Sequence, residues 1–339
     1  MVSWTRHDSG VMCGLKPALE GCTRAYIFDL ENTLIVVKKG HPWKWWHASV
    51  PDKLRDLANA PGNLILISHD AKRNSDENSV LSMVAEIVVQ LGIPVCVLVT
   101  FHGQNAKPRT HTWDLFASQI MPECLHHLVV GHAQQKLMNL KFATNLGCPY
   151  KTPQEFFLNG PLEDLPRLKN WSEWLSSQVP LDSSKWGPRQ QQELVLLVGR
   201  PVSGKTTLAN HVFHRYTILS LDESGTIPKL VKATKCALAD GASVVIDAPN
   251  ATVAERRRYI SCATTPVRAL VISVADDVAN QLNAYREACG GKRVPTITIN
   301  NYFSKYEAPT LEEGICEIHT ATSFIAVPMH KRALFCTHW

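Results

Sequence analysis

Short apolar runs alternate with stretches of helical periodicity in the first half of the chain. The apolar runs lie at residues 25–28, 63–67, 95–99 and 127–130. Between them, apolar positions recur at helical spacing over 80–91 and 112–120. Fully apolar strands separated by helices are typical of a parallel sheet with right-handed crossovers. The pattern therefore predicts an α/β domain with a doubly wound parallel sheet over residues 1–160.

A second alternation follows a stretch of different character. Residues 161–192 are rich in Trp, Pro and polar side chains, and they predict a linker with one amphipathic helix over 168–175. Further apolar runs predict the strands of a second α/β domain over 193–325, with a C-terminal tail at 326–339. These strand-forming runs lie at residues 193–198, 218–219, 242–246 and 269–274.

Composition narrows the class of protein. The chain has 339 residues, of which 45% are hydrophobic and 19% charged, which excludes a disordered, collagen-like or coiled-coil chain. No uninterrupted apolar run is long enough to cross a membrane, and the N-terminus lacks the apolar core of a secretory signal. The net charge of +5 permits an anionic partner without requiring one.

A phosphate-binding loop is the strongest local signal. It fits G-x-x-x-x-G-K-S/T, follows a predicted strand and opens a predicted helix. Backbone N–H groups of such a loop, with the helix N-terminus behind it, hold a polyphosphate. We expect Lys205 to bridge the β- and γ-phosphates of ATP and Thr206 to bind Mg²⁺. The loop residues are Gly199, Arg200, Pro201, Val202, Ser203, Gly204, Lys205, Thr206 and Thr207.

Phosphoryl transfer also needs groups that act on the acceptor and on the moving phosphate. Asp222 follows the next predicted strand, and we expect it to act as the general base on an acceptor hydroxyl. Asp247 ends another strand and is predicted to bind either the acceptor or the metal environment. Helix capping is the structural alternative for both carboxylates. Arg286 is the expected lid residue on the transferring phosphate, whereas Lys292 and Arg293 fit a solvated face better.

The first half carries an aspartate-led motif directly after its first apolar run. The segment FDLENTL resembles the D-x-D-x-T signature of haloacid-dehalogenase phosphotransferases. That resemblance implies that Asp29 is the nucleophile and a Mg²⁺ ligand, and that Glu31 is the acid/base. It also implies that Thr33 and Ser68 bind the substrate phosphoryl group and that Lys107 neutralises its charge. A strand-end turn capped by Asp29 is the alternative.

Longer runs carry a more specific resemblance. The first half contains, in order, FDLENTLI, LISHD, NAKPRTHTWDLF and KFATNLGCPYKTPQEFFLNG. The second half contains GRPVSGKTTLA, SLDESGT, VVIDAPNATVAERRRYISCA and NYFSKYEAPTLEEG. Through these runs, residues 22–320 resemble the polynucleotide kinase 3′-phosphatase family.

The resemblance implies a haloacid-dehalogenase-like phosphatase domain followed by a P-loop kinase domain. It implies a DNA-repair enzyme that phosphorylates 5′-hydroxyl ends with ATP and Mg²⁺ and removes 3′-phosphates. The implied partners are DNA ends, with RNA ends as the alternative, and the implied compartment is the nucleus, with the cytoplasm as the alternative. Only residues 1–21 precede the similar region, so we expect no forkhead-associated domain to recruit scaffold proteins. We also expect a monomer without membrane association.

Several positions depart from the family pattern. Glu31 stands where the family has its second catalytic Asp, and His132 and Asn139 stand where it has Mg²⁺-binding aspartates. A hard cation prefers oxygen ligands, so we expect 3′-phosphatase activity to be weak or absent. In the kinase half, Leu221 and Ala284 replace family arginines.

Three main functions remain open from sequence. The first is a 5′-hydroxyl kinase with a degenerate phosphatase domain, the second is a bifunctional enzyme that tolerates His132, and the third is a non-catalytic module that binds DNA ends. A small-molecule kinase is a weaker alternative. Trp45, in a Trp-rich run near Lys38 and Lys39, either stacks unpaired bases of the substrate or belongs to a packed aromatic cluster.

Overall fold

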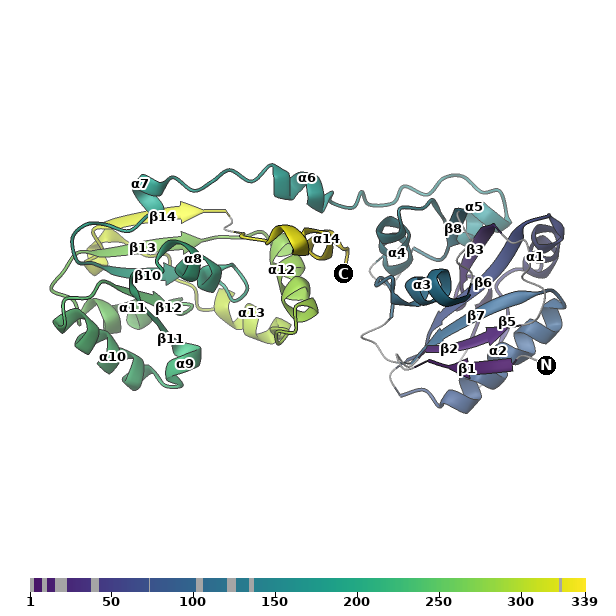
Figure 1. Ribbon diagram of the computed structural model, residues 1–339, viewed down its shortest axis with the longest axis horizontal. Coiled ribbons are helices and arrows are strands. Elements are labelled where there is room, and N and C mark those ends of the chain that lie inside the picture. Colours follow the sequence, from purple (N-terminus) through teal and green to yellow (C-terminus); the bar gives the residue numbers. More distant parts are fainter. Residues whose placement is uncertain are drawn as a thin grey trace. The chain divides into compact units, whose positions relative to one another are not determined.

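The chain folds into two compact units (Figure 1). The computed structural model describes residues 3–7, 11–15, 23–37, 43–72, 74–101, 106–120, 126–133, 137–322 and 325–339. Unit 1 comprises Met1–Lys169 with Thr337–Trp339, and unit 2 comprises Asn170–Cys336. Most of the expected linker and most of the expected tail therefore make their contacts within unit 2. No helix in these ranges is long and apolar enough to cross a membrane.

Unit 1 is built on a seven-stranded sheet in the order β1-β2-β7-β6-β3-β8-β9. The five neighbouring strands β7, β6, β3, β8 and β9 are parallel to one another, as predicted. An antiparallel hairpin of β1 and β2 extends the sheet beside β7. This hairpin was not predicted, because β1 is mostly polar and exposed. The strands are β1 (Ser3–Arg6), β2 (Val11–Leu15), β3 (Arg24–Asp29), β6 (Asn63–Asp70), β7 (Val95–Thr100), β8 (His126–Val130) and β9 (Tyr150–Lys151), with a separate pair β4 (Ile35–Val36) and β5 (Lys44–Trp45).

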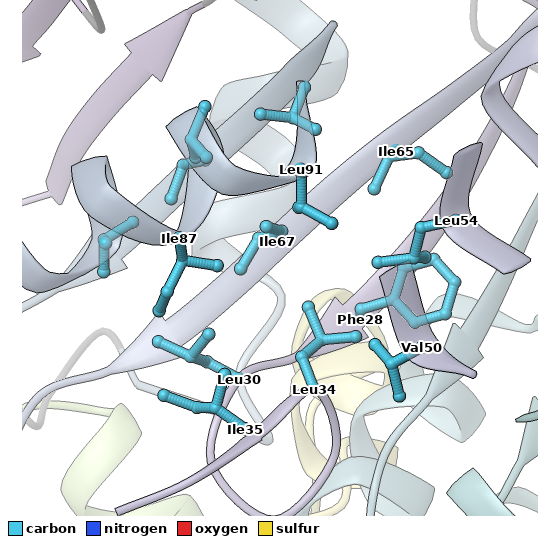
Figure 2. Packing of buried hydrophobic residues seen from close by; sticks show 14 of the residues in the cluster. Phe28, Leu30, Leu34, Ile35, Val50, Leu54, Ile65, Ile67, Ile87 and Leu91 are labelled. Carbon is cyan, nitrogen blue, oxygen red and sulfur yellow. The ribbon is translucent and has the colours of Figure 1, made fainter. Parts of the chain in front are cut away.

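Both faces of this sheet are covered by apolar packing. Ile65 and Ile67 of β6 pack on one face with Ile87 and Leu91 of α2, as Figure 2 shows. Leu64 and Leu66, which alternate with them on β6, belong to a second cluster. Burial on both sides is why the strands are continuous apolar runs. The helices are α1 (Val50–Asn59), α2 (Glu77–Leu91), α3 (His111–Leu115), α4 (Met138–Leu146) and α5 (Pro153–Phe157), with a π-helical turn at Phe116–Ile120.

Unit 2 has a five-stranded parallel sheet in the order β11-β12-β10-β13-β14. The strand expected at 269–274 lies two residues earlier, because its charged second residue, Arg268, is buried in an ion pair with Glu193. The order reverses at the central strand β10, which is where open α/β sheets bind ligands. The strands are β10 (Leu194–Val198), β11 (Thr217–Ser220), β12 (Val244–Asp247), β13 (Val267–Ile272) and β14 (Glu317–Ala321).

Helices from both ends of unit 2 share its core. The helix expected at 168–175 begins later, at Trp171, because the side chain of Asn170 caps it. Phe335 is fully buried against the rings of Trp171, Trp174 and Tyr285. The helices are α6 (Trp171–Ser176), α7 (Ser183–Trp186), α8 (Lys205–Val212), α9 (Leu221–Ser224), α10 (Ile227–Ala239), α11 (Val253–Ile260), α12 (Asp276–Ala288), α13 (Thr296–Phe303) and α14 (Arg332–Cys336), with 3₁₀ turns at Leu311–Glu313 and Met329–Lys331.

Candidate active sites of the two units

The predicted phosphate loop of unit 2 joins the central strand β10 to helix α8. A Cβ on Gly199 would lie 2.7 Å from the carbonyl oxygen of Ile272, so only glycine fits between the loop and β13. Gly204 has φ 94 and Val202 has φ 65, both in the left-handed region. The loop therefore curls back on itself before α8 begins, which turns backbone N–H groups toward a common centre.

Lys205 is buried at the first position of α8. Its Nζ donates to the carbonyl oxygens of Gly199 and Arg200, at 2.8 Å in each case. Burial lowers the pKa of Lys205 to about 8, although the charges of Asp247 and Asp222 favour its protonated form. Both predicted carboxylates therefore act electrostatically on the loop lysine.

The next residue links the loop to strand β12. The Thr206 hydroxyl donates to Asp247 Oδ2 at 2.6 Å, and Asp247 is 7% exposed at the end of its strand. Of the two roles predicted for Asp247, this contact favours the metal environment, because a hydroxyl and a carboxylate oxygen side by side suit Mg²⁺. The residues present at this position fit the ion.

A cavity of about 530 Å³ opens beside the loop. The loop from Val202 to Thr207, Asp222 of α9 and Arg286 of α12 all line it. The predicted loop lysine, general base and lid arginine come from separate parts of the sequence. They thus line one cavity that is large enough for a ligand. Glu223 and Gly291 also line it, and neither was predicted as a site residue.

Other predicted loop and lid residues lie outside this cavity. Arg200 is buried, forms an ion pair with Asp276 and lies 4.8 Å from the ring centre of Phe303. Pro201 likewise does not line the cavity. Arg293 pairs with Glu287 at 3.0 Å and, like Lys292, is exposed. These side chains fit structural or solvated roles.

In unit 1, the ends of adjacent parallel strands bring the predicted phosphatase residues together. Asp29 ends β3 and forms an ion pair with Lys107, whose Nζ also donates to the Ser68 carbonyl oxygen at 3.3 Å. Burial raises the pKa of Asp29, but Lys107 and His132 outweigh it and hold the pKa well below its usual range. Burial also opposes the charge of Lys107, but Asp29 and Asp70 raise its pKa.

Three predicted residues, Asp29, Thr33 and Asn139, contact His132. Its Nδ1 lies 3.3 Å from Asp29 Oδ2. The His132 backbone N–H donates to Thr33 Oγ1 at 3.1 Å, and its carbonyl accepts from Asn139 Nδ2 at 3.3 Å. Glu31 lies 3.6 Å from Lys72 and is partly exposed. Thr33 therefore anchors the His132 segment, while the carboxylate of Glu31 pairs with a lysine at the surface.

Unit 1 does not fit Mg²⁺ at the position expected from the sequence. The two oxygens of Asp29 face Lys107 and His132, so both are already engaged by nitrogen groups. Asn139 leaves its buried Oδ1 without a hydrogen-bond partner and carries no charge. Within the described ranges, no three His, Cys, Asp or Glu side chains are grouped to hold a metal ion.

Two further residues at the site of unit 1, one half-buried and one buried, were not predicted. Asp70 ends β6, accepts from the backbone N–H of Lys107 at 3.2 Å and has its pKa raised by burial. His69 is buried beside it, and burial lowers its pKa. The sequence signal that could have identified His69 and Asp70 is their position, one and two residues after Ser68 at the end of strand β6.

Trp45 lies in a packed cluster. Its ring is 5.0 Å from that of Trp43, and Trp46 lies 6.3 Å from Phe157. These tryptophans pack against the buried core of unit 1. The geometry favours the aromatic-cluster alternative over base stacking, and Lys38 and Lys39 lie outside the described residues.

One family model matches part of each unit. Residues 24–157 match the family model described as polynucleotide kinase 3 phosphatase, and residues 194–309 match an AAA domain model. A bifunctional polynucleotide phosphatase/kinase of Schizosaccharomyces pombe is 30% identical over 325 residues, covering 87% of this chain and 79% of that protein. A protein of Acanthamoeba polyphaga mimivirus is 24% identical, covering 96% of this chain and 91% of its own. A solved gluconokinase from Sinorhizobium meliloti covers 44% of this chain and 91% of its own at 13% identity, with a TM-score of 0.34, too low to support an inference.

Proposed function

The chain belongs to the family of bifunctional polynucleotide phosphatase/kinases, and on that premise we propose that unit 2 is an ATP-dependent polynucleotide 5′-hydroxyl kinase. One observation carries the proposal: the phosphate loop, Asp222 and Arg286 line one cavity of about 530 Å³. Phosphoryl transfer needs little covalent chemistry from the protein, only positioning and electrostatic stabilisation. The cavity holds a group for each task.

The chain's residues divide the reaction between them. Backbone N–H groups of the loop and Lys205 hold the triphosphate, and Thr206 and Asp247 would hold Mg²⁺, which neutralises phosphate charge when bound. Asp222 accepts the proton of the 5′-hydroxyl as that oxygen attacks the γ-phosphorus, and ADP leaves as the bond from the β,γ-bridging oxygen to the γ-phosphorus breaks. Arg286 stabilises the charge on the phosphoryl group in flight.

For unit 1, we propose 3′-phosphatase activity far below the kinase activity. Asp29 is ionised, as a nucleophile must be, and Lys107 supports it. However, the engagement of both carboxylate oxygens by Lys107 and His132, and the pairing of Glu31 with Lys72, leave neither a Mg²⁺ cage nor a free acid at Glu31. A catalytic group displaced by about 1 Å lowers the reaction rate by about 100-fold, and the longer side chain of Glu31 displaces its carboxylate by about a bond length.

One oligonucleotide tests both halves. A strand with a 5′-hydroxyl and a 3′-phosphate is incubated with γ-labelled ATP and Mg²⁺, and label on the 5′ end and phosphate released from the 3′ end are measured together. We expect label transfer that Lys205→Ala abolishes, and little phosphate release. Phosphate release as fast as labelling would favour the fully bifunctional enzyme. Binding of ends without transfer would favour the non-catalytic module.

The substrate polymer and the compartment follow from the family rather than from any side chain. We propose DNA ends as the substrate, a role in DNA repair, and the nucleus as the compartment. DNA and RNA versions of the same strand, compared by kcat/KM, test the polymer, because a protein tells them apart by the 2′-hydroxyl. Imaging of the tagged full chain tests the compartment against the cytoplasm.

A further inference from the structure

The chain reverses direction immediately after α12, beside the lid arginine. The backbone N–H of Cys289 donates to the Tyr285 carbonyl, that of Gly290 to Glu287 and that of Gly291 to Arg286, each at 2.9 Å. Gly290 has φ 86, the left-handed conformation that ends many helices. The turn lays Gly291 directly against Arg286.

The absence of a side chain at Gly291 leaves room for Arg286. A Cβ on Gly291 would lie 2.8 Å from Arg286 Cγ and 3.0 Å from the Arg286 carbonyl oxygen. Gly291 is not among the glycines with positive φ, so its backbone conformation does not itself require glycine. The requirement is for the space that the arginine stem occupies.

A second contact holds the segment that follows Gly291 against helix α12. Asn283 is 4% exposed, its Nδ2 donates to the Val294 carbonyl at 2.8 Å, and its Oδ1 accepts from the Val294 N–H at 2.9 Å. Asn283 lies one helical turn before Arg286 on α12. The reciprocal pair of hydrogen bonds therefore fixes the returning chain against the helix that carries the lid arginine.

We propose that Gly291 and Asn283 are positioning residues for Arg286, and that residues 289–294 form a pre-closed clasp that holds its guanidinium in the cavity. This inference rests on the proposed kinase function. A free arginine side chain samples many rotamers, and a clasp that restricts its stem pre-organises the charge before substrate arrives. Ala284, two residues before Arg286 on α12, is buried and uncharged, so it supplies no charge to the cavity.

The test is a double-mutant cycle on the full chain, read as kcat and KM for ATP with a 5′-hydroxyl oligonucleotide. We expect Gly291→Ala to lower kcat by about 10- to 100-fold, as small misplacements of catalytic groups do, with KM for ATP nearly unchanged. In an Arg286→Ala background, Gly291→Ala should have no further effect, because the group it positions is gone.

Gly241→Asn is the control, at the glycine that follows α10 outside the clasp. Gly241 has φ 83, Asn tolerates that left-handed conformation, and a Cβ at Gly241 meets no atom within 4 Å. We expect this variant to keep the wild-type kcat. Asn283→Asp, which can accept from Val294 but cannot donate, should lower kcat by an intermediate factor and Asn283→Ala by more, again only when Arg286 is present.

Different outcomes would contradict the clasp and the proposed kinase function. An unchanged kcat in Gly291→Ala, or an equal loss with and without Arg286, would overturn the clasp. An inactive wild type, or an Arg286→Ala variant with wild-type rate, would instead overturn the proposed kinase function or the role of Arg286 in it. Circular dichroism melting of each variant identifies any loss that comes from unfolding.

Discussion

ATP binding should weaken steeply as the solution becomes alkaline, because the loop lysine is buried. The pKa of Lys205 in the free protein is about 8, lowered by burial from its usual value. Raising the pH through that value removes the positive charge that the triphosphate needs. Phosphates attract the proton back, so the bound lysine titrates at a higher pH than the free one.

The magnitude follows from the pKa. If only the protonated lysine binds, the Kd for ATP rises by the factor 1 + 10^(pH − pKa), which is about 10-fold between about pH 7 and about pH 9 for a lysine with a pKa of about 8. The phosphate of a monoester loses its second proton near about pH 6, so the ligand contributes little over this range.

Isothermal titration calorimetry with a non-hydrolysable ATP analogue measures this effect. Titrations in buffers of different ionisation enthalpy should show net proton uptake on binding above about pH 8. Lys205→Arg is the control, because arginine stays charged and should remove the pH dependence even if it binds less tightly. A Kd for the wild type that stays flat or falls toward alkaline pH would refute the reasoning.

Three further changes probe the base, the buried ion pair and the C-terminal helix of unit 2. Asp222→Asn should lower kcat by about 100-fold or more with a much smaller change in the Kd for ATP, measured by steady-state kinetics and calorimetry; a normal kcat would remove Asp222 as the base. Arg268→Met should cost about 3–5 kcal/mol in the free energy of unfolding, measured in urea, because it leaves Glu193 buried without its partner at 2.6 Å. Adding Glu193→Gln to Arg268→Met should restore part of that loss, and a wild-type stability of the single variant would contradict the role of the pair. Phe335→Ala should cost about 3–5 kcal/mol in the same assay, since its fully buried ring contacts three others, whereas a neutral effect would mean that α14 does not stabilise unit 2.

Some residues of the candidate sites could be predicted from local sequence patterns, and others could not. The phosphate loop was predictable because its function resides in consecutive backbone N–H groups, which the glycine spacing fixes. Asp222 in unit 2 and Asp29 in unit 1 were predictable because, in each unit, the carboxyl ends of the parallel strands lie at one edge of the sheet. Gly291 was not, because its importance lies in a contact with Arg286 that spacing alone does not reveal.

The sequence by itself determined the two α/β units, the parallel strands and the phosphate loop, because these follow from short-range periodicity and steric requirements along the chain. Only the tertiary structure decided which charges pair. In the folded chain, the two oxygens of Asp29 contact Lys107 and His132, Thr206 donates to Asp247, and Phe335 of α14 packs into the core of unit 2. Electrostatic and packing energies depend on distances between residues remote in sequence, and only the folded chain sets those distances.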